Sequence, residues 1–296
     1  MGIFSFLFGK SEKQEVSGSP EYEEIGPLTK VEIYSGKKAA KIFADNWKRI
    51  ARSCIPAVHI IASAEKEISL QQSNFGSYPC IPTDFDYPKD QMGNYMYPLA
   101  QINFRDVPKI PGYPESGYLQ FYISASDELY GLDFKQPCDQ IGFRVLFFEE
   151  SDVKEHKTDF SFLGNLLHDN LGPVEKPLLL SFKREDEFVG LNDNRYQSKK
   201  EFHISQLGDE NPLMRDEIEE AAEQDFDSSG HKIGGYAFFT QDDPRTATTR
   251  DWVLLLQIDT ADNIMWGDAG VGNFFIDSTN LQNKDFSKVL YNWDCC

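Results

Sequence analysis

The chain has 296 residues, of which 40% are hydrophobic and 14% aromatic, so it can bury a core without disulfides or a structural metal. Its 48 acidic residues outnumber its 29 basic ones, and the net charge of −19 disfavours nucleic acids and anionic membranes as partners and favours a basic partner. The five cysteines form no CxxC pair and the five histidines no i, i+4 pair, so we predict free thiols in the reducing cytoplasm, no metal site and no cofactor.

The first 30 residues differ in composition from the rest of the chain. Residues 1–8 are apolar, but they are too few to cross a bilayer and lack a cleavage site, so we expect no stable membrane insertion. Residues 9–30 are rich in Ser, Glu, Gly and Pro, which is typical of a flexible connector. We therefore predict an apolar start and a flexible linker over residues 1–30, followed by one globular domain over residues 31–296.

Two segments have the spacing of amphipathic helices. Apolar residues recur at helical intervals from Gly36 to Cys54, and Pro56 ends the pattern, so we predict a helix that covers a sheet. A buried strand is expected directly after it, at residues 58–62. A second, mostly solvated helix is predicted from a narrow stripe of apolar residues: Met214, Ile218, Ala221 and Ala222.

One sequence pattern occurs twice in the chain. A glycine turn leads to an apolar strand that ends in glutamine, and a glycine-led aromatic strand follows. The corresponding residues are Gly76, Gln101 and Phe121 in the first copy and Gly234, Gln257 and Phe274 in the second. The spacings are similar, 25 and 20 positions against 23 and 17. A repeat of this kind predicts two similar β units, about residues 71–190 and 230–296, within one body.

Runs of apolar and aromatic residues between Gly- and Pro-containing turns predict the strands of both units. They lie near residues 98–104, 117–123, 142–148 and 177–182, and then 236–241, 252–259, 272–276 and 286–290. We therefore expect an α+β fold that is predominantly β, a roll-like body of two similar β units with a few peripheral helices. Strands and helices do not alternate, which disfavours a doubly wound nucleotide-binding fold.

Four motifs carry a family resemblance. They are residues 74–82 (NFGSYPCIP) in the first unit and 234–236 (GGY), 254–259 (LLLQID) and 266–270 (WGDAG) in the second. With these motifs the chain resembles the YwqG-like family of bacterial proteins, a domain family of unknown function, over about residues 71–296. The resemblance implies a β-rich, roll-like fold and carries over no catalytic residues. It also implies an association of some relatives with toxin and immunity genes.

Four residues are candidates for contact with a ligand. Gln101 and Gln257 end strongly apolar strands, where a buried amide must bond either to the backbone of an adjacent turn or to a ligand. Trp266 and Asp268 lie in a glycine-rich turn, and Asp268 is the first candidate for a functional acid. Residues 267–272 place their glycines as GxxGxG and precede a strand, which excludes a dinucleotide-binding turn.

The sequence contains no recognisable catalytic constellation, which leaves enzymatic activity open and favours a non-enzymatic binding protein. We expect an intracellular protein whose acidic surface recognises a basic protein partner, as an immunity protein recognises a toxin domain. The alternative is a small-ligand binder or an enzyme that uses a cleft between the two β units, formed by Gln101, Gln257, Trp266 and Asp268. A third hypothesis is an accessory domain that is tethered to a larger assembly through residues 1–30.

Overall fold

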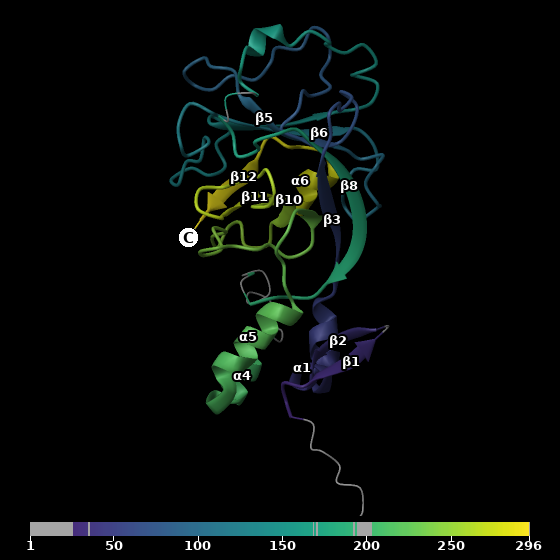
Figure 1. The fold of residues 1–296 in the computed structure, drawn as a ribbon, viewed down its shortest axis with the longest axis vertical. Coiled ribbons are helices and arrows are strands. Elements are labelled where there is room, and N and C mark those ends of the chain that lie inside the picture. The colour runs from purple at the N-terminus through teal and green to yellow at the C-terminus, as the bar shows by residue number, and fades with distance from the viewer. Residues whose placement is uncertain are drawn as a thin grey trace, which may run out of the picture.

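β-Strands dominate the described part of the chain. The computed structural model describes residues 26–34, 36–167, 169, 171–191, 193 and 203–295. The predicted apolar start and linker lie outside these residues, apart from residues 26–30. The helices are short and lie at the periphery of a large sheet, so the fold is the expected β-rich α+β fold (Figure 1).

Ten strands form one antiparallel sheet. They are β3 (Ile55–Ala64), β4 (Asn74–Phe75), β5 (Tyr97–Asn103), β6 (Tyr118–Ile123), β7 (Phe143–Phe148), β8 (Leu178–Glu187), β9 (Lys232–Gly234), β10 (Val253–Asp259), β11 (Val271–Ile276) and β12 (Val289–Asp294). Their spatial order is β12-β11-β10-β9-β3-β8-β4-β5-β6-β7. Read outward from the central β3–β8 pair, the order is therefore the same on both sides, and β4–β7 and β9–β12 are two similar β units.

The two units join the central pair at opposite ends. β3 and β8 pair along their full length, with Ile55 opposite Glu187 and Ala64 opposite Leu178. β4 pairs with Leu178 and its neighbour, whereas β9 pairs with β3 near Ala57. This arrangement gives the sheet an approximate twofold symmetry about the middle of the β3–β8 pair.

Aromatic side chains from both units meet in one core. The ring centroids of Phe121 on β6 and Phe274 on β11 are 4.8 Å apart, and Phe274 stacks on Tyr291 of β12 at 4.7 Å. Phe143 on β7 lies 5.2 Å from Tyr291, so the two edge strands face each other across this core. The sheet is therefore rolled, and its interior is filled by side chains (Figure 1).

Both units carry the same irregularity in the same strand. The pairing of β5 with β6 shifts register between Pro98 and Ala100, and the pairing of β10 with β11 shifts between Leu254 and Leu256. Each shift lies just before the glutamine of its strand. A bulge adds local twist to the strand that carries it, which helps a wide sheet to roll.

The strand predicted at residues 236–241 is wrong. The structure places β9 earlier, at Lys232–Gly234, and the chain leaves the sheet there. Gly234 and Gly235 both have left-handed backbone conformations, with φ of 71° and 70°, which turn the chain out of a strand path. The following segment gains its hydrogen bonds from side chains instead, as described below.

The remaining elements of the chain are short. Those at the N-terminal side are β1 (Lys30–Tyr34), β2 (Lys37–Ala40), α1 (Lys41–Asp45), α2 (Trp47–Ile50) and η1 (Ala51–Ser53). Those that follow β7 and β8 are η2 (Ser161–Leu163), α4 (Gln206–Glu210), η3 (Pro212–Met214) and α5 (Arg215–Asp225), and α6 (Ser278–Gln282) follows β11. No helix in the described part of the chain combines the length and the apolar character needed to cross a bilayer.

A helical lobe, made of residues 26–53 and 203–226, lies beside the sheet (Figure 1). The sheet-covering helix predicted from Gly36 to Cys54 is helical only over residues 41–53, where it is divided into α1, α2 and η1, because residues 37–40 form β2. Its apolar side contacts another helical segment rather than the sheet: Phe43 packs edge-on against Phe226, with centroids 5.2 Å apart. The second predicted helix is confirmed as α5, with its apolar stripe turned into this lobe.

The shared aromatic core predicts a large stability loss for Phe274→Ala. Removing a fully buried phenylalanine that touches both units is expected to lower the free energy of unfolding by roughly 3–5 kcal/mol. Urea unfolding followed by circular dichroism measures this loss. Phe134→Ala is the matched control, because this side chain is 73% exposed and its removal is expected to change stability by less than about 0.5 kcal/mol. Equal effects of the two substitutions would contradict the shared core.

Candidate functional site

Gln101 on β5 is buried and bonded to backbone. Its Oε1 accepts from the N–H of Cys80 at 2.7 Å, and its Nε2 donates to the carbonyls of Leu70 at 2.7 Å and Gln72 at 2.9 Å. The same Oε1 accepts from Nε2 of Gln120 at 2.8 Å. Both donors and both acceptor positions of this amide are thus used within the protein.

Gln257 on β10 makes the equivalent contacts in the second unit. Its Oε1 accepts from the N–H of Phe238 at 2.8 Å, and its Nε2 donates to the carbonyls of Ser228 at 2.9 Å and Gly230 at 2.8 Å. The positions also correspond. Gln72 lies two residues before Asn74, the strand partner of Gln101, and Gly230 lies two residues before Lys232, the strand partner of Gln257. The two glutamines therefore do the same structural work.

A second amide completes each arrangement. Nε2 of Gln120, opposite Gln101 in the sheet, donates to the carbonyl of Cys80 at 2.7 Å. Nδ2 of Asn273, opposite Gln257, donates to the carbonyl of Phe238 at 2.9 Å. We call each pair, Gln101 with Gln120 and Gln257 with Asn273, an amide clamp, because it binds both backbone groups of one residue as a neighbouring strand would.

The amide clamps explain why residues 236–241 are not a strand. Phe238 lies within residues 236–241. Its N–H donates to Gln257 and its C=O accepts from Asn273, so neither group pairs with a neighbouring strand. A buried backbone group needs such a partner, and the side chains supply it. The glutamine donors point at backbone carbonyls, not into a cavity.

Trp266 and Asp268 occupy different environments. Trp266 is fully buried, with its ring 5.9 Å from Tyr130 and 6.0 Å from Trp293, and a side chain at Gly272 would collide with it. Asp268 lies two residues further on and is exposed. The structure therefore does not bring the four candidate residues together at one pocket: both glutamines and Trp266 lie inside the fold, and Asp268 lies on its surface.

A buried ion pair supports the Gly-Gly-Tyr motif. Nζ of Lys232 lies 2.9 Å from Oε1 of Glu187, whose other oxygen accepts from the N–H of Tyr236 at 2.8 Å. A Cβ at Gly235 would collide with this carboxylate, which is why glycine is needed there. Burial alone raises the pKa of Glu187, but hydrogen bonds from His59 and Lys232 and the lysine charge hold it below its usual range. The pair links β8 to β9 and is structural.

Two kinds of reactive site were considered in the sequence, a metal centre and a cysteine nucleophile at Cys80. No group of three or more His, Cys, Asp or Glu side chains is arranged to hold a metal ion within the described ranges. Burial raises the pKa of the Cys80 thiol to about 11, so it stays protonated and unreactive near neutral pH.

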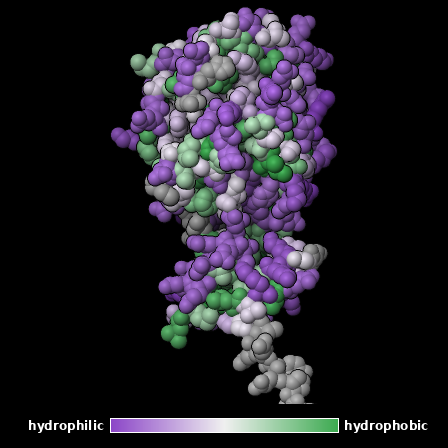
Figure 2. Space-filling model, in the orientation of Figure 1, coloured by the Kyte–Doolittle hydropathy of each residue, from purple (hydrophilic) through white to green (hydrophobic). Residues whose placement is uncertain are grey.

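An acidic groove of about 480 Å³ lies between the segment before β5 and the loop that joins β6 to β7. Of the ten large apolar side chains that the described residues expose, four line it: Met92, Leu129, Phe134 and Ile141. Four aspartates and a single lysine also line it: Asp90, Asp127, Asp133, Asp139 and Lys135. Figure 2 shows a face of the protein where hydrophilic residues dominate and apolar ones form small patches, so such an apolar lining is a local feature.

Asp90 fixes the shape of the acidic groove. Its carboxylate accepts from Oγ of Ser124 at 3.0 Å and Oγ of Ser126 at 2.5 Å, and from the N–H groups of Met92 and Asn94, both at 2.9 Å. Burial raises the pKa of Asp90, but these hydrogen bonds outweigh it and lower the pKa below its usual value. One ionised side chain thus ties the two walls of the groove together.

Sequence reasoning missed the acidic groove, because its residues come from loops that are far apart in the sequence. The available signal was the density of aspartates and unpatterned apolar residues between 127 and 141, which fits neither a strand nor a solvated turn. Exposed apolar residues among acidic ones are typical of a binding surface.

The fold and these surfaces define a β-rich α+β protein, a rolled ten-stranded sheet with a helical lobe and an acidic, apolar-lined groove. A model of the family described as "Domain of unknown function (DUF1963)" matches residues 73–295, and the chain belongs to this family. The match runs from β4 to β12 and leaves out β3, although β3 is one of the central strands. No curated protein matches the chain.

The amide clamp predicts a strong destabilisation by Gln257→Met. Methionine keeps the volume but leaves the Phe238 N–H and two carbonyls without partners, so we expect a loss of roughly 3 kcal/mol or more in the free energy of unfolding. Urea unfolding measures it, with Gln71→Met on an exposed side chain as the control. An unchanged unfolding midpoint for Gln257→Met would contradict a structural role.

His231 predicts an acid-sensitive fold. Its Nδ1 accepts from the N–H of Asp259 at 2.9 Å, and burial lowers its pKa from 6.5 to about 4. His231 takes up a proton below about pH 6.5 in the unfolded chain but only near pH 4 in the folded chain. Its contribution to stability is therefore complete above pH 6.5. As the pH falls below this value, the free energy of unfolding decreases by at most about 1.4 kcal/mol per pH unit.

His231→Asn tests this assignment. Asparagine offers an acceptor near the Nδ1 position and cannot take up the proton, so the variant is expected to unfold with about one proton less taken up between pH 6.5 and 4. Urea unfolding at several pH values gives the slope. An identical slope for the variant and the wild-type chain would assign the acid sensitivity to other groups.

Proposed function

We propose that the chain is a YwqG-like bacterial protein of the cytoplasm that acts without catalysis, by binding a basic protein partner in the acidic groove. The observation that carries the proposal is the lining of this groove, where four large exposed apolar side chains stand among four aspartates. Apolar contacts would supply most of the affinity, and the aspartates would select a partner rich in Lys and Arg.

The overall charge supports the same partner. At −19, the protein attracts cationic proteins over a distance and repels acidic ones, which speeds the encounter and excludes competitors. A partner whose own function depends on binding phosphate would carry such a basic surface. Covering that surface is how an acidic immunity-type protein would inhibit it, and this is the biological role that we propose.

The alternative of a ligand site or active site between the two β units receives no support from the contacts. The glutamine amides that would line such a cleft bond to backbone, and the rings of Phe121 and Phe274 meet where the units face each other. These contacts favour a surface site over a site between the two units.

The proposal predicts that Phe134→Ser combined with Asp139→Lys removes partner binding. Immobilised wild-type chain is expected to recover a basic protein from a bacterial lysate at physiological salt, and the double variant at least tenfold less of it. Quantitative mass spectrometry of the retained proteins measures the difference. Both side chains are exposed, so the fold should persist, which circular dichroism checks.

The chain offers a matched control in the helical lobe. Leu213→Ser combined with Asp216→Lys makes the same kinds of change at another exposed place, since Leu213 is 96% exposed. This control is expected to recover as much partner as the wild-type chain. Equal losses in both double variants would show a nonspecific charge effect and would contradict the proposal. Failure of the wild-type chain to recover any protein, even at low salt, would also contradict it.

A further inference from the structure

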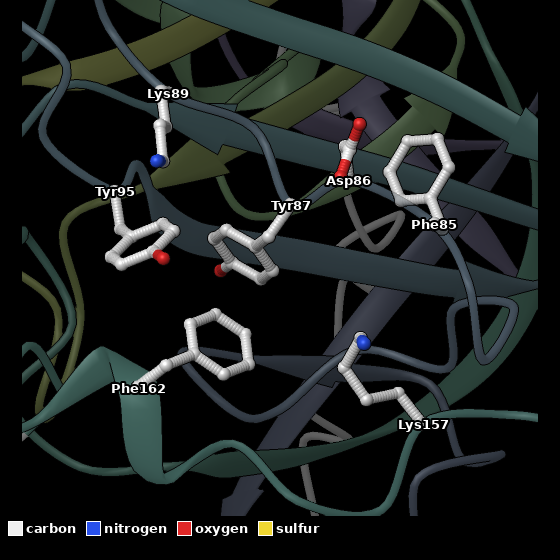
Figure 3. A pocket seen from close by; sticks show the side chains of 7 residues that line it. All are labelled: Phe85, Asp86, Tyr87, Lys89, Tyr95, Lys157 and Phe162. Carbon is white, nitrogen blue, oxygen red and sulfur yellow. The ribbon is translucent and has the colours of Figure 1, made fainter.

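Aromatic rings line a second pocket, which has a volume of about 470 Å³ (Figure 3). Tyr87, Tyr95 and Phe162 contact one another edge to face, with centroid distances of 5.8 Å for the two tyrosines and 5.4 and 5.0 Å from Phe162 to Tyr87 and Tyr95. Tyr87 is buried, while Phe162 is 36% exposed, and Phe85 forms another wall. The pocket thus offers ring surfaces that a planar ligand could cover.

Two lysines reach this aromatic pocket. Figure 3 shows the amine of Lys157 pointing toward the space beside Tyr87 and Phe162, and the amine of Lys89 lying on the other side of the rings, near Tyr95. Nζ of Lys157 donates one hydrogen bond, to the carbonyl of Thr83 at 2.8 Å, which leaves two of its three donors for a ligand.

The backbone holds both lysines in place. A β-bridge pairs Lys89 with Tyr95, and Nζ of Lys89 lies 4.7 Å from the centroid of that ring. The N–H of Lys157 donates to the carbonyl of Ile81 at 2.9 Å, next to a bridge between Pro82 and His156. The pocket is therefore built from fixed segments rather than from side chains that happen to approach each other.

The charge of the aromatic pocket opposes that of the acidic groove. Two lysines and one aspartate line the aromatic pocket, whereas four aspartates and one lysine line the groove. In a chain with 48 acidic and 29 basic residues, a pocket with a local excess of positive charge is suited to an anion. The lysines also disfavour a cationic ligand, which rings alone would accept.

We propose that the aromatic pocket binds a small aromatic anion, whose ring packs on Tyr87 and Phe162 while its phosphate or carboxylate pairs with Lys157. The volume lies within the range of small-molecule sites, and the pocket combines four aromatic side chains with two lysines, which suits a ligand that carries both a ring and a negative charge. The residues that line this pocket differ from those that line the acidic groove, and the proposal does not rest on the proposed protein partner.

Isothermal titration calorimetry of the full chain at low salt tests the proposal with four probes: AMP, indole-3-acetate, adenosine and inorganic phosphate. At least one of the two aromatic anions is expected to bind at least tenfold more tightly than adenosine and inorganic phosphate. Tighter binding of AMP or of indole-3-acetate identifies the anionic group as phosphate or carboxylate. Inorganic phosphate that binds as tightly as the aromatic anions would overturn the role of the rings.

Two variants assign binding to the aromatic pocket. Lys157→Met, which keeps the aliphatic stem, is expected to weaken the aromatic anion about tenfold, and Phe162→Ala to weaken it similarly. Lys154→Met, on an exposed side chain three positions away, is the matched control and is expected to change nothing. Thermal unfolding checks that each variant is folded. The proposal fails if neither aromatic anion binds at 5 mM, or if Lys157→Met and Phe162→Ala leave the affinity unchanged.

Discussion

Hydrogen bonds between buried side-chain amides and backbone are the interaction on which the rest of this fold depends. In each β unit, one glutamine donates to a backbone carbonyl that precedes the first strand. Together with a second amide, it also bonds to the N–H and the C=O of one non-strand residue that follows this strand, Cys80 or Phe238. Buried backbone that is neither helix nor strand is costly unless it is bonded, and the amide clamps bond it. They let loops cross the sheet without opening the core to water.

This solution leaves the interior to packing and moves molecular recognition to the loops. Where the two units meet, the rings of Phe121, Phe274 and Tyr291 pack against one another. The acidic groove and the aromatic pocket are both made by segments that leave the sheet between β4 and β8. A rigid scaffold whose loops carry the surface features is a common arrangement in proteins.

The sequence predicted the scaffold better than the surfaces. The repeated glutamines marked strands correctly, because apolar runs and glycine turns are local signals. Burial required partners for their amides but left open whether these were backbone or ligand, and the structure shows backbone. The prediction of a strand at 236–241 was wrong because the periodicity of the sequence shows neither the positive φ at Gly235 nor the side-chain partners of Phe238. The helix after Gly36 was predicted too long, because its first residues, 37–40, pair with β1 in a hairpin. Lys89 and Lys157 are brought to the same pocket only by the fold, so no spacing rule could connect them.

The short hairpin at residues 89–95 belongs to both binding surfaces. Lys89 and Tyr95 form one wall of the aromatic pocket, and Asp90 and Met92, between them, line the acidic groove. A molecule that repositions this hairpin from one side changes the energy of association on the other. Thermodynamic reciprocity then requires that the influence be equal in both directions, so a metabolite and a macromolecular partner that shared this segment could not act independently.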